Sequence, residues 1–338
     1  MAKISSERLR LMFVQNGVLF ALIALIILFA ALNPRFLSIN NIQTIVLQIA
    51  ELGLIALPVA FLIMQANVDL SVGSVATLSA VVGGLAMVGS GSVFVGIAVG
   101  ILAGAAAGLL NGALISLAGL NSFVVTLGFM SAWSGLALFL TNGKTITGLP
   151  AEFTALGSFA PGGIRIQIIL LVLALVIAWY VLNHTTRGRE ILAVGGNLRA
   201  SQLMGLKVHN IRVSTYVVTG AVAGFVGILL AAKLGAVSPI VGQGMELSAL
   251  TVVLLGGVAF EGGSGRIRSV LYGLAFVGVL KNGLVIMGIS AYIQTILVGL
   301  TLVLAVALDR GIQQAVAKSI ASSARRRARR LDNSAAAE

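Results

Sequence analysis

NHTTRGREILAVGGNLRASQLMGLKVHNIR, residues Asn183–Arg212, is a polar run between two long apolar stretches. It carries five basic residues, both histidines of the chain and a single acid, Glu190. Because each charge placed in hydrocarbon costs about 2.5–3.5 kcal/mol, the run is expected to lie in water. Its lysines and arginines place it on the cytoplasmic side of a membrane. As the longest charged stretch between apolar segments, it is either a docking surface or a loop kept basic only for topology.

The polar run contains the signals of a short helix. Asn197 is a good N-cap residue, and Gly205 suits the C′ position, where the backbone is left-handed. The residues between them can form two helical turns. Gly195 and Gly196, just before the cap, are expected to let the chain turn sharply. The pattern predicts a short helix lying across the cytoplasmic end of a membrane bundle.

Composition assigns the protein to the polytopic helical membrane proteins. The 338 residues are 58% hydrophobic and only 9% charged, whereas a soluble domain has about 25% charged residues. The apolar runs are long and continuous, unlike the short alternating segments of a transmembrane β-barrel. The absence of cysteine excludes disulfides and cysteine-ligated metals, and two histidines without H-E-x-x-H argue against a zinc enzyme. No metal site, cofactor or catalytic group is predicted.

The hydropathy pattern predicts ten membrane spans, which places both termini on the same side. The predicted spans are 17–32, 42–66, 72–88, 93–118, 123–141, 166–182, 213–233, 245–260, 270–287 and 292–308. With both termini inside, 17 of the 22 basic residues face the cytoplasm and only four face outward. This asymmetry favours cytoplasmic termini and accounts for the net charge of +12 better than nucleic-acid binding does.

The sequence contains a weak internal repeat. The segment 119–126, GLNSFVVT, matches 288–295, GISAYIQT, and Asn111 upstream of the first matches Asn282 upstream of the second. Asp69-Leu-Ser also resembles Glu246-Leu-Ser. The matches keep the same order and pair spans two to five with spans seven to ten. Because a unit of five spans is odd, the pattern predicts two inverted five-helix repeats, an arrangement typical of transporters.

The fourth predicted span has a glycine at every fourth position: Gly96, Gly100, Gly104, Gly108 and Gly112. Such a ladder leaves one helix face without side chains, so that another backbone can approach closely. The ladder permits either a helix that slides against its neighbour or static close packing.

Polar residues inside or between the apolar spans are candidates for a translocation path. Asp69 is the sharpest of them, although it can also act as the N-cap of the third span. Lys281 either lines such a path or extends toward the membrane surface. The residues predicted for the path are Asp69, Ser71, Asn111, Asn121, Phe123, Thr126, Asn282 and Gln294. Some of these are alternatively hydrogen-bonding contacts between helices.

The chain lacks the loop that binds ATP. Gly143-Lys144-Thr145 looks like the end of a phosphate loop, but the position of its first glycine is held by Leu138. We therefore expect no ATP hydrolysis by this chain. The tail from residue 313 to residue 338, with Arg325–Arg330, is expected to be a disordered basic segment that contacts anionic lipid headgroups.

Three motifs closely resemble the permease subunits of ribose-type carbohydrate ABC importers: NVDLSVGSV (67–75), TTRGREILAVGGNLRASQLMGLKV (185–208) and LSALTVVLLGGVAFEGGSGRI (247–267). The likeness runs from about Leu11 to Ile312. It implies a type II importer fold in the bacterial inner membrane, a homodimer of permeases, a cytoplasmic ATPase and a periplasmic sugar-binding protein. It also implies that 183–212 is the coupling loop within a permease domain of residues 1–312, with Arg189, Gly195, Asn197, Arg199, Ala200 and Gly205 contacting the ATPase.

The resemblance favours the import of a monosaccharide, ribose-like or another pentose or hexose. A related ABC permease for branched-chain amino acids or another small polar metabolite is the first alternative. A self-sufficient secondary transporter would require a relay of acids or histidines within the spans, and Asp69 with Lys281 is too little for one. A membrane enzyme would need a nucleophile–base pair, which the sequence does not offer.

Overall fold

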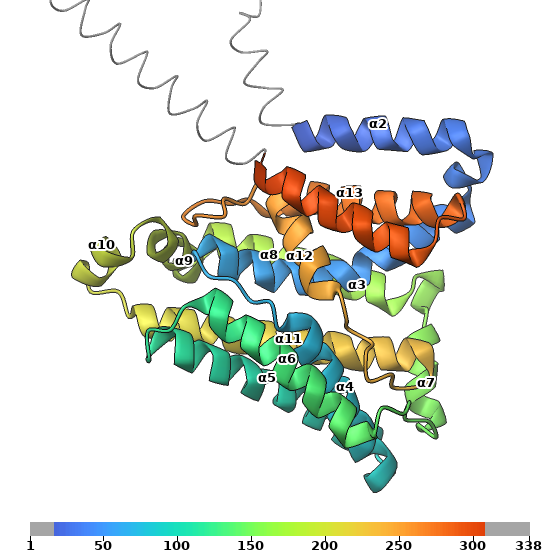
Figure 1. Ribbon diagram of the computed structural model, residues 1–338, viewed down its shortest axis with the longest axis horizontal. Coiled ribbons are helices and arrows are strands. Elements are labelled where there is room, and N and C mark those ends of the chain that lie inside the picture. The colour runs from blue at the N-terminus through green and yellow to red at the C-terminus, as the bar shows by residue number, and fades with distance from the viewer. Residues whose placement is uncertain (1–16, 308–338) are drawn as a thin grey trace, which may run out of the picture.

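The computed structural model describes residues 17–307, which form a bundle of helices (Figure 1). Within them, seven helices are long and apolar enough to cross a bilayer: α3 (Ile39–Met64), α4 (Val72–Ser90), α5 (Val93–Ser116), α6 (Ser122–Thr141), α8 (Ile166–His184), α11 (Val208–Leu234) and α13 (Ile267–Ile286). Three shorter apolar helices are α2 (Gly17–Leu32), α12 (Met245–Leu255) and Ala291–Ala307. Each predicted span coincides with one of these helices, and the all-α polytopic membrane architecture is confirmed. The predicted basic tail lies outside the described residues.

Short helices occupy the connections between the long ones. They are η1 (Pro34–Leu37), α7 (Ala151–Ser158), η2 (Pro161–Gly163), α9 (Thr186–Gly196) and α10 (Leu198–Leu203). The predicted short helix after Asn197 is α10. The helix α9 was not predicted, and Gly195 and Gly196 form its last turn rather than a loop. The predicted sharp turn before Asn197 is therefore wrong.

The helix α12 is shorter than its predicted span. It ends at Leu255 instead of Phe260, because Gly257 adopts a left-handed backbone with φ of 77°. At 1.5 Å per residue, its 11 residues cover about 16 Å, roughly half of the hydrocarbon thickness. The helix α12 therefore begins and ends at different depths from its long neighbours.

The long helices form two groups joined by α3. In Figure 1, α4, α5, α6 and α11 lie together, while α2, α13 and the helix Ala291–Ala307 lie on the opposite side of the bundle. The helices α3, α8 and α12 lie between them. The helix α3 packs against α12 and α13 and also against α11, so it connects the two groups.

The helix contacts follow the predicted repeat. The repeat pairs α3 with α11, α4 with α12 and α5 with α13. The helix α11 packs on α4 and α5, while α3 packs on the corresponding α12 and α13. Each long first helix thus packs against the second and third helices of the other unit, which is the pattern expected of two related units that exchange their first helices.

The glycine ladder of α5 packs against the backbone of α11. A Cβ added at Gly104 would overlap the carbonyl oxygen of Gly220, and a Cβ added at Gly220 would overlap that of Gly104. At Gly108, an added Cβ would overlap the carbonyl oxygen of Tyr216. The two backbones are in direct contact along several turns, as small-residue faces in membrane helices allow. This geometry is close packing, and it places α5 and α11 in one tightly packed unit.

The connections gather at two opposite ends of the bundle. Figure 1 shows α9 and α10 at one end and α7 at the other. At the α9 end, the backbone N–H of Gly263 donates to the carbonyl oxygen of Met64 at 2.9 Å. At the α7 end, Ile146 and Val237 form an isolated antiparallel bridge. The connections predicted to be cytoplasmic therefore meet at the α9 end of the bundle. Those predicted to lie outside meet at the α7 end.

Candidate functional site

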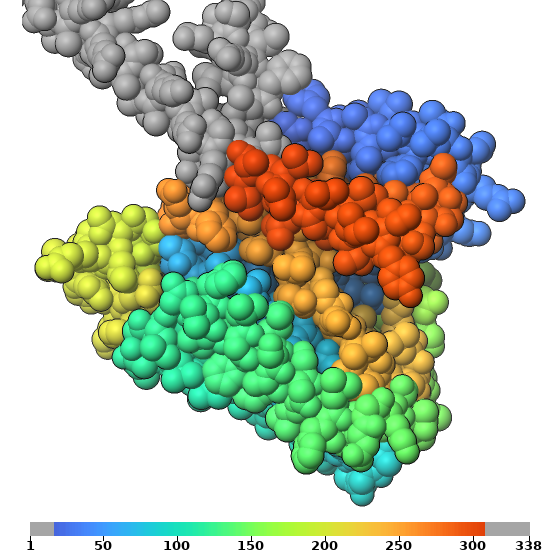
Figure 2. Space-filling model, in the orientation of Figure 1, coloured from blue at the N-terminus to red at the C-terminus, as the bar shows by residue number. Residues whose placement is uncertain are grey.

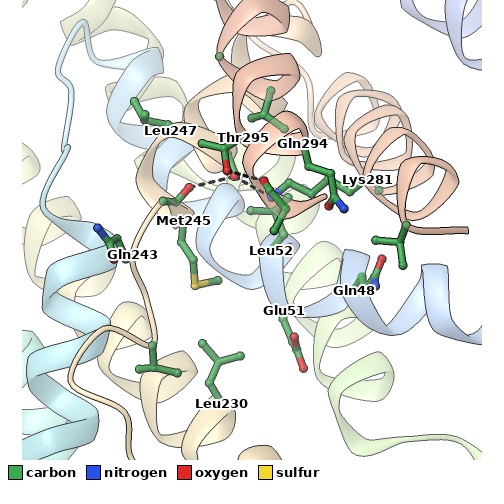
Figure 3. A pocket seen from close by; sticks show the side chains of 18 residues that line it. Gln48, Glu51, Leu52, Leu230, Gln243, Met245, Leu247, Lys281, Gln294 and Thr295 are labelled. Atoms are coloured by element: carbon green, nitrogen blue, oxygen red, sulfur yellow. Dashed lines mark hydrogen bonds between the residues drawn. The ribbon is translucent and has the colours of Figure 1, made fainter. Parts of the chain in front are cut away.

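A cavity of about 440 Å³, whose mainly apolar lining includes several polar side chains, opens between α3, α12, α13 and the helix Ala291–Ala307 (Figure 3). Its volume falls in the range of about 300–1,000 Å³ that is typical of small-molecule sites. Polar side chains from five separate segments converge on it: Gln48, Glu51, Gln243, Ser248, Lys281 and Gln294. Figure 3 shows Lys281, Gln294 and Thr295 grouped on one side, with Gln48 and Glu51 of α3 on the other.

A chain of hydrogen bonds holds the cation of the cavity in place. Lys281 Nζ donates to Ser248 Oγ at 2.9 Å, and Ser248 Oγ donates to the carbonyl oxygen of Gly244 at 2.9 Å (Figure 3). The chain links α13 to the first turn of α12. An ionisable side chain within a membrane-spanning helix such as α13 is costly, and such residues usually mark a functional path.

The acid of the cavity is paired. Glu51 Oε1 lies 2.7 Å from Nζ of Lys233, at the end of α11, and the two side chains are 12% and 34% exposed. The ion pair joins α3 to α11, the corresponding first helices of the two repeats. It also neutralises the carboxylate charge of the lining, so that Glu51 does not face the cavity as a lone anion.

Two glutamine side chains leave hydrogen-bonding capacity inside the cavity. Gln48 Oε1 is buried and has no hydrogen-bond partner among the described residues. Gln294 donates through Nε2 to the carbonyl oxygen of Ile289 at 2.9 Å, which leaves its Oε1 as an acceptor. Buried polar atoms without a partner are rare in native proteins, and a missing water or ligand often explains them.

A second polar cluster lies where α3 is followed by α4. Asp69 Oδ1 accepts hydrogen bonds from the N–H of Ser71 at 2.8 Å and from its hydroxyl at 2.6 Å. Asn111 Nδ2 on α5 donates to Ser71 Oγ at 2.8 Å. Burial raises the pKa of the Asp69 carboxyl above its ordinary value, and the hydrogen bonds from Ser71 act in the opposite direction.

The predicted role of Asp69 as an N-cap is wrong by two positions. The N-cap of α4 is Ser71, and its side chain makes no capping hydrogen bond to the helix. The chain stays non-helical up to Ser71, so the only backbone N–H that donates to the Asp69 carboxylate is that of the cap residue itself. Asp69 therefore stabilises the turn that leads into α4 rather than the first turn of the helix.

The remaining residues predicted for the path lie in other places. Asn121 is the N-cap of α6, and its Oδ1 accepts from the N–H groups of Phe123 and Val124. Phe123 is exposed, whereas Thr126 is buried and donates to the carbonyl oxygen of Ser122 at 2.8 Å. Asn282 is buried on α13, one residue from Lys281. Among the predicted path residues, Gln294 is the one that lines the cavity.

Sequence reasoning missed Gln48, Glu51 and Gln243. A signal for two of them exists, since Gln48 and Glu51 are three residues apart and share one face of an apolar span. The polar pair on one face of α3 indicated a lined surface rather than contact with lipid. Gln243 gave no such signal, because it lies in the connection between α11 and α12.

The helices α9 and α10 form a projection at one end of the bundle (Figure 2). The predicted cap of α10 is confirmed, because Asn197 Oδ1 accepts from the N–H of Ala200 at 2.9 Å. The predicted left-handed residue after the helix is also confirmed, with φ of 81° at Gly205. Arg189, Arg199 and Ala200 are exposed, as are Leu203 and Met204 at the end of α10.

Gly195 anchors this projection to the bundle. A Cβ at Gly195 would overlap the carbonyl oxygen of Met64 and would lie 2.7 Å from the backbone nitrogen of Gly263. The end of α9 therefore packs directly on the connections that follow α3 and α12. Glycine is required here for the close approach of three backbone segments rather than for a turn.

Residues 41–306 match a family model described as the permease component of branched-chain amino acid transport systems. The chain belongs to this permease family. This match, together with the ribose import permeases among its relatives, confirms the resemblance found in its motifs, and the protein is a multi-pass membrane permease.

Curated relatives align with this permease over most of its length. The ribose import permease protein of Bacillus subtilis (strain 168) is 38% identical, with 87% of this chain and 92% of the relative covered. The D-allose transport system permease protein of Escherichia coli (strain K12) is 33% identical, covering 88% and 92%. The L-arabinose ABC transporter permease protein of Azospirillum brasilense is 35% identical, covering 84% and 85%. No solved structure matches the permease.

Proposed function

We propose that this permease is the transmembrane subunit of an ATP-binding-cassette importer that moves a monosaccharide across the bacterial inner membrane. The observation that carries the substrate class is the set of relatives, because permeases named for ribose, allose and arabinose align over more than four-fifths of both chains. The cargo of this importer is a pentose or hexose, and ATP is hydrolysed by separate ATPase subunits.

The helices α9 and α10 supply the docking surface for the ATPase. The coupling loop 183–212 is the part of the permease domain 1–312 that forms this projection. Leu203 and Met204 at its tip are each 82% exposed. Two large apolar side chains beside exposed arginines in an aqueous region are typical of a surface that a partner covers.

The charge distribution supports one orientation of the permease in the membrane. The α9 end, which bears five basic residues in 183–212 and two more in Arg266 and Arg268, faces the cytoplasm, and both termini lie on that side. The α7 end then faces the periplasm, where a sugar-binding protein delivers the cargo. A second copy of the permease completes a homodimer, and the basic tail 313–338 contacts anionic lipid.

Import of a branched-chain amino acid is the alternative that the family description keeps open. An amino acid presents both an ammonium and a carboxylate group, so its site needs charged groups of both signs that are free to pair. Glu51 is already paired with Lys233, so the cavity offers the cation Lys281 and uncharged amides but no open carboxylate that could pair with an ammonium group. This composition favours a hydroxylated neutral cargo.

Uptake into membrane vesicles tests the proposal. The permease is co-expressed with the ATPase and binding-protein candidates of its own genome, and radiolabelled ribose, allose, arabinose and leucine are offered separately. We expect saturable, ATP-dependent uptake of at least one sugar and background uptake of leucine. Leucine uptake without sugar uptake would establish the alternative. Sugar uptake that continues without the ATPase would contradict an ATP-driven importer.

A further inference from the structure

We propose that the cavity between α3, α12, α13 and the helix Ala291–Ala307 is a receiving site that binds the sugar within a single permease protomer. The inference rests on the proposed function and extends it, because it assigns a ligand site to residues inside one chain. The site takes a neutral polyhydroxylated molecule and holds it on the side of the membrane away from the ATPase.

The cavity lies in the half of the bundle that is remote from α9. The last residue of α3, Met64, packs on Gly195 of α9, so Gln48 and Glu51, in the first half of α3, lie toward the other end. The helix α11 begins at Val208, shortly after α10 ends, and its lining residue Leu230 lies four residues before its end at Leu234.

The helix α13 and the helix that follows it also place the cavity at the end of the bundle remote from α9. The helix α13 starts at Ile267, shortly after Gly263 makes its hydrogen bond with Met64. Lys281 lies near the opposite end of α13, and Gln294 and Thr295 belong to the first turns of the next helix. Three long helices thus contribute lining residues from their ends remote from α9, which places the cavity on the substrate-entry side under the proposed orientation.

The open hydrogen-bonding groups match the hydroxyl groups of a sugar. Lys281 has three N–H donors and uses one on Ser248, so two remain for ligand oxygens. Gln48 Oε1 and Gln294 Oε1 are acceptors that can receive ligand hydroxyl protons. A sugar hydroxyl both donates and accepts, and donors beside acceptors around one space satisfy such groups without a net charge on the ligand.

The walls suit transit rather than tight storage. Leu52, Leu230, Met245 and Val298 present aliphatic surface to the C–H faces of a sugar ring, and the described lining contains no aromatic side chain on which a ring could stack. A site on a transport path must bind strongly enough to accept the cargo and weakly enough to release it. We therefore expect half-occupancy only at millimolar sugar.

Single-cysteine labelling tests the site directly, because the native chain has no cysteine. Thr295→Cys places a thiol on the cavity wall, and a membrane-impermeant methanethiosulfonate reagent is added to the periplasmic side of the assembled importer. We expect labelling, and we expect millimolar ribose, allose or arabinose, whichever is transported, to slow it several-fold while leucine does not. Ala151→Cys on α7 is the control, because Ala151 is exposed at the end of the bundle remote from α9 and does not line the cavity, so its labelling should be independent of sugar.

Lys281 provides the second arm. In the Thr295→Cys background, Lys281→Met is expected to keep the thiol reactive but to raise the protecting sugar concentration at least tenfold, and Lys281→Arg is expected to restore part of the protection. If the thiol is labelled but sugar does not slow the labelling, the cavity is only a water-filled space and the inference is overturned. A thiol that never reacts would overturn it too. Either result alongside intact sugar uptake refutes the receiving site alone, whereas absence of sugar uptake in the unmodified importer refutes the proposed function.

Discussion

Lys281 Nζ donates a hydrogen bond to Ser248 Oγ at 2.9 Å and thereby ties α13 to α12. The corresponding helices of the first repeat are tied in the same way, because Asn111 Nδ2 on α5 donates to Ser71 Oγ at the start of α4 at 2.8 Å. Ser71 and Ser248 are the serines of the repeated acid-Leu-Ser motif. In each half of the permease, the serine of the motif therefore ties the start of one helix to a neighbouring helix. Its partner is the neutral amide of Asn111 in the first half and the cation of Lys281, beside the cavity, in the second.

The serine of the first repeat is expected to be structural. Ser71→Ala removes one donor to Asp69 and the acceptor of Asn111 at a fully buried position. Leaving buried polar groups unsatisfied costs about 1–3 kcal/mol each, so the midpoint of thermal unfolding in detergent should fall. Ser90→Ala at the other end of α4 is the matched control, because Ser90 is exposed and bonds only locally. Equal midpoints for the two variants would contradict the role of Ser71.

The contact between α5 and α11 is expected to reject a single methyl group. Gly104→Ala forces Cβ into the carbonyl oxygen of Gly220, and overpacking of this kind typically costs about 1–3 kcal/mol. Gly128→Ala on α6 serves as the control, since nothing lies within 4 Å of its added Cβ. Thermal unfolding of both variants in the same detergent gives the comparison. If Gly104→Ala is as stable as the control, the two helices separate easily and the sliding interpretation of the glycine ladder regains support.

Two neighbouring glycines at the end of α9, Gly195 and Gly196, differ in whether the structure has room for a side chain. Gly195→Ala drives Cβ into the carbonyl oxygen of Met64, whereas the nearest atom to a Cβ on Gly196 is 3.8 Å away, an ordinary contact. We expect Gly195→Ala to lower stability by about 1–3 kcal/mol and to increase protease cleavage within 183–212, and Gly196→Ala to do neither. Limited proteolysis in vesicles measures the difference. Indistinguishable cleavage patterns would show that α9 is not seated on the loops as described.

Local signals in the sequence were read correctly where a few neighbouring residues determine the structure. The cap at Asn197 and the left-handed Gly205 delimit α10 because both act within one helical turn. The same local reasoning failed at Gly195. Its reason for being glycine is a contact with Met64 and Gly263, which are distant in the sequence, so no spacing within the loop could reveal it.

The cavity likewise combines residues that the sequence could single out with partners that only the fold brings together. Gln294 and Lys281 were recognised as polar residues in apolar spans, but the partners that make them a site come from α3 and from the connection before α12. The motif at Asp69 drew attention because its acid is rare in the membrane, yet the packing of α4 against α5 and α11 encloses it away from the cavity. Polarity identified candidate residues, and only the fold could separate a lined cavity from a buried hydrogen-bonded cluster.

Substitutions in α10 and at its end test whether the projection formed by α9 and α10 docks on a partner. Gly205→Val places a β-branched residue at φ of 81°, where a left-handed backbone costs about 1–2 kcal/mol, and nothing lies within 4 Å of its added Cβ to complicate the reading. Gly205→Asn is the matched control, because asparagine tolerates the left-handed region. Ala200→Glu puts a charge on an exposed face without disturbing the core.

If α10 docks on the ATPase, Ala200→Glu buries an unpaired charge in the interface, and Gly205→Val misdirects the end of the helix. Both variants should insert normally but lose ATPase during co-purification and lose ATP-driven sugar uptake in vesicles, whereas Gly205→Asn should retain both. Sugar binding to the isolated binding protein should not change, since it occurs on the other side of the membrane. Wild-type assembly and uptake in both variants would reduce the loop to a topological anchor, because a helix that can carry a new charge and a strained end without effect is not seated in a partner.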